Sequence, residues 1–241
     1  MVHLKFDCLK RFKKIFVLIS GGIDSTYLYE IIKKWHGNRV YPVNCYNPYE
    51  NSDTLKQIKN LDPNFIQIFP SKNLNYKKIL REAFLSLPKA LELKKQGKYH
   101  KKIFGCCYYI KHKAFLSHPM FKEEGTVVVS GIKRGDGKQR RIFLSQLRNG
   151  TFKTLPEKKP TFFLKHRTGQ LYFYPFRDYN FKELPKITMN RLRKKYPNLK
   201  HSGCKICPVL LLFNEKSDMS RYEKSKKYAQ NLGLDVSLFL N

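Results

Sequence analysis

Acidic residues are scarce in this sequence of 241 residues, where Asp and Glu together number 18 against 48 Lys and Arg. The formal net charge is therefore +30 at pH 7. A charge of this size repels other copies of the chain and concentrates polyanions around it. We expect a nucleic acid as the partner, with a general enrichment in lysine over all solvated faces as the alternative.

Long apolar runs are also missing. A helix that spans a membrane needs about 20 consecutive, mostly apolar residues, and no run of that length occurs here. A long basic amphipathic helix, which would bind a membrane surface, is not evident either. The basic stretch 1–14 leads through a short apolar run directly into a glycine-containing loop, which is not the pattern of a signal peptide. We therefore expect a cytoplasmic protein without membrane contacts.

Cysteines are few, but four of the six are paired in sequence. Cys106 and Cys107 are adjacent, and Cys204 and Cys207 enclose two residues. The second spacing lets one tight loop present two thiolates to one metal centre, which favours metal or redox use in a reducing compartment over a secreted disulfide framework. Vicinal cysteines rarely suit one tetrahedral zinc ion, whereas an iron–sulfur cluster offers separate irons. The pattern favours a [4Fe–4S] cluster over zinc, with buried unmetallated thiols as the alternative.

A phosphate site is indicated where the first apolar run, 15–19, ends in Ser20-Gly21-Gly22-Ile23-Asp24-Ser25-Thr26. The glycine pair allows backbone amides to approach an anion, and the helical pattern that follows adds the positive end of a helix dipole. The lysine of a Walker A loop is absent. We expect the hydroxyls of Ser20 and Ser25 to donate to phosphate and the carboxylate of Asp24 to hold Mg²⁺.

Strand-like and helix-like patterns alternate through the first half of the chain. β-Branched and aromatic runs predict strands, and apolar residues three or four positions apart predict helices. The expected strands lie at residues 15–19, 39–46, 64–69 and 126–131, and the expected helices start at residues 26, 53 and 75. This order predicts an α/β fold built on a doubly wound parallel sheet, with residues 1–135 as the nucleotide-binding core.

The rest of the chain, 136–241, is expected to form a smaller C-terminal region that contains the Cys-x-x-Cys pair. Segment 87–112 is rich in lysine and predicts a mobile basic connector, helical in part. Segment 134–167 predicts a basic loop and a hairpin rather than core. Two further helices are expected at residues 182–196 and 217–232, with Gly233 as the cap of the second.

The segment from Ser20 to Thr26 resembles the pyrophosphate loop of the adenine nucleotide α-hydrolase-like superfamily. Its members include the N-type ATP pyrophosphatases, the tRNA-thiolating enzymes and the sulfonucleotide reductases. The resemblance implies a HUP-like PP-loop fold and cleavage of ATP at the α-phosphate, with release of pyrophosphate. It also implies that adenine lies near the end of the second strand. The residues expected to bind the nucleotide are Ser20, Gly21, Gly22, Asp24, Ser25, Thr26 and Cys45.

The order of further motifs resembles the phosphoadenosine phosphosulfate reductase family. The matching segments are Cys106-Cys107 before Lys111, Gly131-Ile132-Lys133-Arg134, Tyr174-Pro175-Phe176-Arg177-Asp178, and Gly203-Cys204-Lys205-Ile206-Cys207-Pro208. Sulfonucleotide reductases use a cysteine on a C-terminal tail as nucleophile, and no cysteine follows Cys207 in this sequence. Cys8 and Cys45 remain as alternative nucleophiles. We therefore do not expect sulfate reduction of that kind.

The function that we expect is ATP-dependent sulfur transfer to a nucleic acid. The enzyme would adenylate an oxygen on a base, with tRNA favoured over DNA, and sulfur from a donor that the sequence does not name would displace AMP. Asp24 and Arg134 are the expected catalytic residues, while Arg140 and Arg141 would contact the α-phosphate region or the nucleic-acid backbone. The alternatives are a sulfonucleotide reductase and a non-catalytic basic nucleic-acid-binding protein. The oligomeric state stays open, with a homodimer as one arrangement.

Four tyrosines are candidates for stacking against nucleic-acid bases. They lie in two pairs, Tyr108 with Tyr109 and Tyr172 with Tyr174. Tyrosines in apolar runs are more often part of a hydrophobic core, which is the alternative for each of them. The sequence does not distinguish the two pairs.

Overall fold

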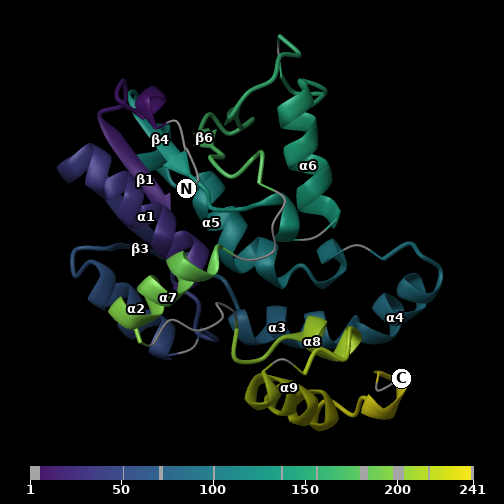
Figure 1. Cartoon of the computed structure of the whole chain (residues 1–241). Helices are drawn as coiled ribbons and strands as arrows, with labels where there is room; N and C mark the ends of the chain where they lie inside the picture. Colours follow the sequence, from purple (N-terminus) through teal and green to yellow (C-terminus); the bar gives the residue numbers. More distant parts are fainter. Residues whose placement is uncertain are drawn as a thin grey trace. The chain divides into compact units, whose positions relative to one another are not determined.

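The structure is a computed structural model. It describes residues 6–50, 52–70, 73–99, 101–136, 138–155, 157–179, 184–197, 204–216 and 218–239. The chain divides into two compact units, each assembled from segments far apart in the sequence (Figure 1). The sheet unit contains Met1–Asn44, Ser52–Gln67 and Leu116–Ser202, and the cysteine unit contains Cys45–Asn51, Ile68–Phe115 and Gly203–Asn241. Residue 135 falls inside the sheet unit, and a domain boundary at that residue stays a prediction.

A single six-stranded sheet, in the order β3-β2-β1-β4-β6-β5, confirms the α/β fold class. β1 pairs in parallel with β2 and with β4, β4 pairs in parallel with β6, and only β5 is antiparallel to its partner β6. The strands are β1 (Lys14–Leu18), β2 (Val40–Cys45), β3 (Ile66–Ile68), β4 (Thr126–Val129), β5 (Phe163–Lys165) and β6 (Leu171–Phe173). The apolar, largely β-branched composition of β1 and β4 suits central strands that are covered on both faces.

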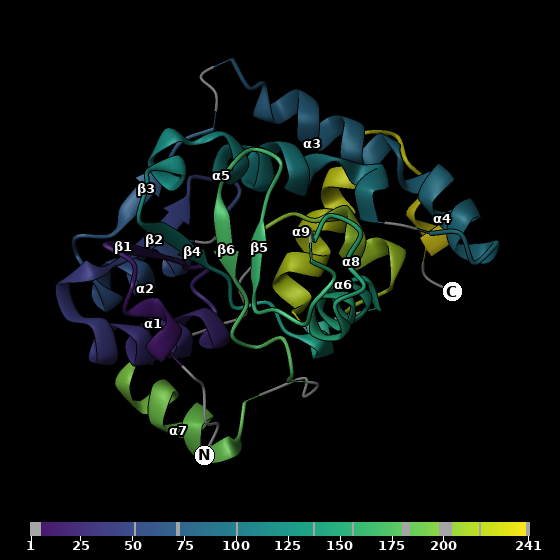
Figure 2. The same cartoon turned by 90° about the horizontal axis from the view of Figure 1, so that it is seen from above.

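Helices cover both faces of the sheet, as a doubly wound fold requires. Because side chains alternate along a strand, β1 presents Ile15 and Val17 to one face and Phe16 to the other. The first face packs against α1 (Ile23–His36) and α7 (Lys186–Lys195), which lie on the same side of the sheet in Figure 2. On the opposite face, the ring of Phe16 meets Phe121 of η5 (Pro119–Lys122) edge to face, with 5.2 Å between the ring centroids. Both faces are therefore buried.

The segment expected to be a mobile connector, helical in part, does contain helices, but it contributes to a core. α4 (Leu87–Lys95) buries Leu87 and Ala90 completely in the cysteine unit. Pro88 does not interrupt this helix, because proline is tolerated in the first turn, where its missing N–H would have no intrahelical partner. The other helices of this core are α3 (Tyr76–Leu85), η3 (Lys101–Phe104), α8 (Pro208–Leu212), α9 (Met219–Asn231) and η7 (Val236–Phe239).

The expectation for segment 134–167 is half right. Its end forms β5, which pairs antiparallel with β6 beyond the segment, but its first part forms α6 (Lys138–Asn149) rather than a loop. Leu144 and Leu147 of α6 are fully buried. The apolar residues of this helix, 142–144 and 147, lie between cations, so its helical periodicity is weak in the sequence. The remaining elements are η1 (Asp7–Leu9), η2 (Gly37–Arg39), α2 (Ser52–Leu61), η4 (Tyr108–His112), α5 (Lys113–Ser117) and η6 (Arg134–Asp136).

The expected helices at 182–196 and 217–232 correspond to α7 and α9, although Lys182 and Ser217 lie outside the described residues. Gly233, with φ of +77°, follows α9 in the left-handed conformation that suits a helix end. Among the helices that the structure describes, none is both long enough and apolar enough to cross a membrane.

A pair of leucines two positions apart tests whether α4 belongs to the core. Leu87 is fully buried, whereas Leu85 at the end of α3 is 41% exposed. We predict that Leu87→Ala lowers the free energy of unfolding by about 2–5 kcal/mol, the usual cost of a cavity at a buried leucine. Leu85→Ala should cost less than about 1 kcal/mol. Urea denaturation followed by circular dichroism measures both, and equal losses would contradict the burial of α4.

Candidate functional site

The loop between β1 and α1 occupies the point where the connections of the sheet change direction. From β1 the chain continues to β2 and β3 on one side, and it then returns to β4 on the other side of β1. In open α/β sheets, ligands bind outside the carboxyl ends of the strands at such a switch point. Ser20 to Ser25 follow β1 directly, and Gly131 to Arg134 follow β4, its parallel neighbour. The two segments therefore leave the sheet at the same edge.

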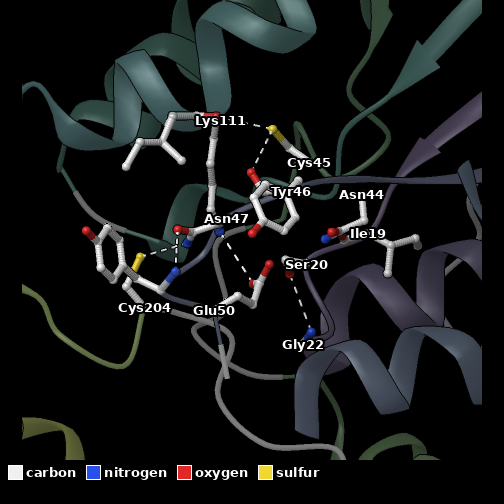
Figure 3. A network of polar contacts seen from close by, with 12 residues as sticks. Ile19, Ser20, Gly22, Asn44, Cys45, Tyr46, Asn47, Glu50, Lys111 and Cys204 are labelled. Carbon is white, nitrogen blue, oxygen red and sulfur yellow. Dashed lines mark hydrogen bonds and ion pairs between the residues drawn. The ribbon is translucent and has the colours of Figure 1, made fainter. Parts of the chain in front are cut away.

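Hydroxyl groups hold the loop in shape. Ser25 Oγ donates to the carbonyl of Gly22 at 3.0 Å, and it accepts from the backbone N–H of Ser20 at 3.2 Å. The N–H of Gly22 points back to Ser20 Oγ at 3.4 Å (Figure 3). No side chain of the described residues caps the amino end of α1. Thr26 is fully buried there, and its hydroxyl has no hydrogen-bond partner within the described chain. The helix end thus retains the polar groups that bind anions.

Gly21 is required by both its backbone angle and its surroundings. Its φ of +73° lies in the left-handed region that side chains disfavour. A Cβ placed on Gly21 would also stand 2.3 Å from Cγ2 of Thr54 in α2, which is far inside contact distance. The methyl group of Thr54 therefore packs directly against the loop.

Asp24 is paired with a lysine that the sequence analysis did not assign to the site. The ammonium of Lys133 contacts the carboxylate of Asp24 and lies 3.8 Å from that of Asp136. The side chain of Lys133 is only 2% exposed, and these carboxylates compensate its buried ammonium group. The sequence signal was the lysine that stands before Arg134, directly after the fourth strand, but only the strand order brings it to Asp24.

Arg134 lies on the same rim. Its backbone N–H donates to the carbonyl of Tyr179 at 3.0 Å, which fixes the start of η6. Its side-chain Nε is buried and has no hydrogen-bond partner in the part of the chain that the structure describes. An anion would satisfy such a donor. Of the other expected arginines, Arg140 forms an ion pair with Asp136 at 3.2 Å, and Arg141 is exposed.

The four cysteines expected to bind a metal centre all belong to the cysteine unit. A hydrogen bond with Cys107 and burial raise the pKa of Cys106, and the charges of Cys207 and Cys204 act in the same direction. Burial also raises the pKa of Cys204, against the opposing effect of Lys111. The four thiols therefore share one electrostatic neighbourhood, although the two pairs lie about a hundred residues apart in the sequence.

A short backbone pairing holds the second cysteine pair in place. Cys204 and Glu50 form an antiparallel bridge, and the N–H of Lys205 donates to the carbonyl of Tyr49 at 2.7 Å. Next to it, the amide Nδ2 of Asn47 donates to Cys204 Sγ at 3.1 Å (Figure 3). The turn after β2 thus supports this cysteine loop, which no motif in the sequence indicated.

A second lysine–carboxylate pair lies beside the thiols. Nζ of Lys111 is 3.5 Å from Oε1 of Glu50, whose side chain is 1% exposed. Burial lowers the pKa of Lys111, but Glu50 and Cys204 outweigh this effect and raise it overall. Lys111 therefore stays protonated and favours thiolates nearby. Lys111 belongs to a motif that the sequence analysis names. Glu50 belongs to no motif, so the sequence did not predict its place beside the thiols.

Four thiols are the donors that an iron–sulfur cluster needs, and the cluster itself stays a prediction. Within the described residues, no group of three or more His, Cys, Asp and Glu side chains is arranged to hold a metal ion. Tetrahedral zinc needs all of its sulfurs at about 2.3 Å from one point, whereas a cluster binds each thiolate to a different iron. A hydroxyl donor also lies near the thiols: Tyr99 Oη is buried without a hydrogen-bond partner among the residues described. Burial, reinforced by Cys207, raises the pKa of Tyr99 to about 12, which keeps this hydroxyl protonated.

The remaining two cysteines are placed differently. Cys45 is 2% exposed, and its thiol donates to the carbonyl of Ile110 at 3.2 Å. Burial raises its pKa to about 12, so at neutral pH it is a protonated donor and a poor nucleophile. Cys8 lies in η1 of the sheet unit, where burial likewise raises its pKa. Cys45 as an adenine contact stays a prediction.

Comparison with solved structures gives a structural likeness. No protein-family model matches the chain, and no curated protein matches it. Among solved structures, the chain is similar to the U34-tRNA thiolase NcsA from Methanococcus maripaludis, determined with its [4Fe-4S] cluster. The identity is 15% and the TM-score 0.47, and the match covers 96% of this chain and 76% of that one. A likeness at this level leaves the activity to be argued from the chain's own residues.

Two effects make Gly21 necessary, the positive φ and the contact with Thr54, and mutations can separate them. We predict that Gly21→Ala lowers the free energy of unfolding through backbone strain of about 1–2 kcal/mol and a clash of about 1–3 kcal/mol. Thr54→Ser removes the methyl group that a Cβ would meet, so the Gly21→Ala/Thr54→Ser variant should recover the clash and retain the strain.

Gly233→Ala is the matched control, because its φ is +77° and an added Cβ would meet nothing within 4 Å. Its loss in chemical denaturation should equal the strain alone. If Thr54→Ser restores none of the stability lost in Gly21→Ala, α2 does not approach the loop as closely as described.

Proposed function

We propose that the protein is an ATP-dependent sulfur transferase that cleaves ATP to AMP and pyrophosphate and modifies a base in a nucleic acid, with tRNA as the favoured substrate. The observation that carries this proposal is the glycine loop at the switch point of the sheet. It has no Walker lysine, and Asp24, Lys133 and Arg134 gather on its rim. The cysteine group with a lysine beside it supports sulfur chemistry.

In the first step, the carbonyl oxygen of a base attacks the α-phosphorus of ATP, and the bond to the bridging oxygen breaks. Pyrophosphate leaves with the electron pair, and the ring N–H of the base loses its proton to water. The amides at the start of α1 and the guanidinium of Arg134 stabilise the charge that develops on the phosphates. Asp24 would hold Mg²⁺, which neutralises charge on the leaving pyrophosphate. Lys133 would leave Asp24 and pair with a phosphate oxygen, so that a second cation stabilises the phosphates.

In the second step, sulfur of the hydrosulfide class adds to the activated carbon of the base. AMP leaves with the former carbonyl oxygen, and the proton of the hydrosulfide returns to the ring nitrogen. A cluster bound by Cys106, Cys107, Cys204 and Cys207 would hold or deliver this sulfur. The ammonium of Lys111 offsets the negative charge of the thiolates, and Asn47 orients Cys204 through its hydrogen bond.

The products of ATP cleavage test the first step. We predict AMP and pyrophosphate, released faster when bulk tRNA is present, and a fall of at least about 100-fold in Asp24→Asn, because a charge partner of the transition state is lost. Asp7→Asn is the control, since its side chain is 71% exposed. Chromatography of labelled nucleotides gives the answer. ADP and orthophosphate would refute the pyrophosphatase, and RNA binding without any cleavage would identify a non-catalytic binding protein.

Metal content tests the cysteine group. We predict that protein purified without oxygen is brown and contains about four irons and four sulfides per chain. Cys204→Ser should lose them, whereas Cys8→Ser in η1 should retain them. Iron and sulfide analysis with absorption spectra provides the measurement. Zinc in place of iron, or iron that is unaffected by Cys204→Ser, would contradict the cluster.

A further inference from the structure

Two neighbouring tyrosines beside the cysteine pair are exposed to solvent. Tyr108 is 50% exposed and Tyr109 is 46% exposed, directly after Cys107 in the chain. Their rings meet edge to face, with centroids 5.4 Å apart. The other candidate pair behaves in the opposite way, because Tyr172 and Tyr174 are 6% and 5% exposed and belong to the core. The structure thus separates two pairs that looked alike in the sequence.

The backbone around the exposed pair is unusual. η4, which begins at Tyr108, is a π-helix, a rare conformation that occurs mostly as single turns and often at functional sites. It is preceded by Gly105, with a φ of +63°. A Cβ on Gly105 would come within 3.3 Å of the ring of Tyr109, so the glycine makes room for that ring. The ring of Tyr109 therefore packs over Gly105, and its backbone lies in a helical turn.

The segment that contains the two rings is basic in sequence. Between Glu92 and Glu123 the sequence contains no acidic residue. On η4 and the start of α5, His112 and Lys113 are exposed. Glu50, the carboxylate that pairs with Lys111 of this segment, is itself buried and does not face solvent. Proteins that bind unpaired nucleic-acid strands combine exposed aromatic rings with basic residues. The rings stack with bases, and the basic residues attract phosphates.

We propose that Tyr108 and Tyr109 form a stacking platform for an unpaired base of the RNA substrate. This proposal rests on the proposed function and specifies where that substrate docks. Since Tyr108 follows Cys107 in the chain, a base stacked on the platform lies beside the cysteine group that would supply sulfur. Stacking tolerates any base, so the platform selects unpaired nucleotides and not a sequence. A duplex keeps its bases in its own stack and gains nothing from the platform.

The test is binding of a short single-stranded RNA that carries 2-aminopurine, whose fluorescence falls when it stacks on an aromatic ring. The wild-type chain should quench it without ATP. Tyr108→Ala/Tyr109→Ala should abolish the quenching and weaken binding by roughly 5- to 150-fold for each base lost from the stack. Tyr108→Phe/Tyr109→Phe should keep both, because the rings remain. Trp35→Ala, which removes an aromatic residue that is 64% exposed on α1, is the matched control and should change neither.

Salt dependence separates stacking from charge. Loss of the rings should leave the slope of log affinity against log salt unchanged, while Lys113→Ala should reduce it by about 0.7 and leave the quenching intact. Equal quenching by the double alanine variant, or equal binding of the RNA and its duplex, would overturn the platform. Wild-type protein that quenches the RNA but releases no AMP from ATP would refute the proposed enzyme and leave the platform standing.

Discussion

The candidate nucleotide loop depends on the ion pair between Lys133 and Asp24. A buried ammonium group is costly unless a carboxylate compensates it, and the side chain of Lys133 is almost completely buried. The pair ties the first turn of α1 to the segment that leaves β4, and Asp136 adds a second carboxylate from η6. Because β1 and β4 are neighbours in the sheet, this one contact fixes the loop, the helix end and the backbone position of Arg134 against each other.

A similar ion pair lies in the cysteine unit, where the buried carboxylate of Glu50 pairs with the partly exposed Lys111 beside the thiols. Only 18 residues of the chain are acidic, yet carboxylates stand beside both candidate sites. The scarce negative charges hold lysines in place where chemistry is proposed, and the cations left uncompensated give the chain its net charge. Each candidate site thus contains a lysine, Lys133 or Lys111, whose positive charge can also attract a negatively charged ligand.

Local patterns predicted much of the fold but not the contacts that define the sites. The apolar run of β1 and the periodicity of α1 were sufficient for a strand, a loop and a helix, and the two cysteine pairs were visible from their spacing. The core position of α4 and the helix α6 were not predicted, because lysines and arginines stand among their apolar residues, and burial of Leu87 or Leu144 shows only in three dimensions. Lys133 reaches Asp24 from 109 residues away through the order of the strands, and no single sequence encodes that order in a local signal.

Stability alone does not explain the buried ion pairs. A hydrophobic pair of similar volume often stabilises a protein as well as a buried salt bridge does, because the charges pay a large desolvation cost. An apolar substitute would still allow β1 and β4 to pack, since Ile15, Val17, Val127 and Val129 already fill that face of the sheet. What it would not provide is an ammonium group that can exchange one anionic partner for another. Lys133 next to Asp24, and Lys111 next to Glu50 and the thiols, are therefore better explained by ligands of changing charge than by folding.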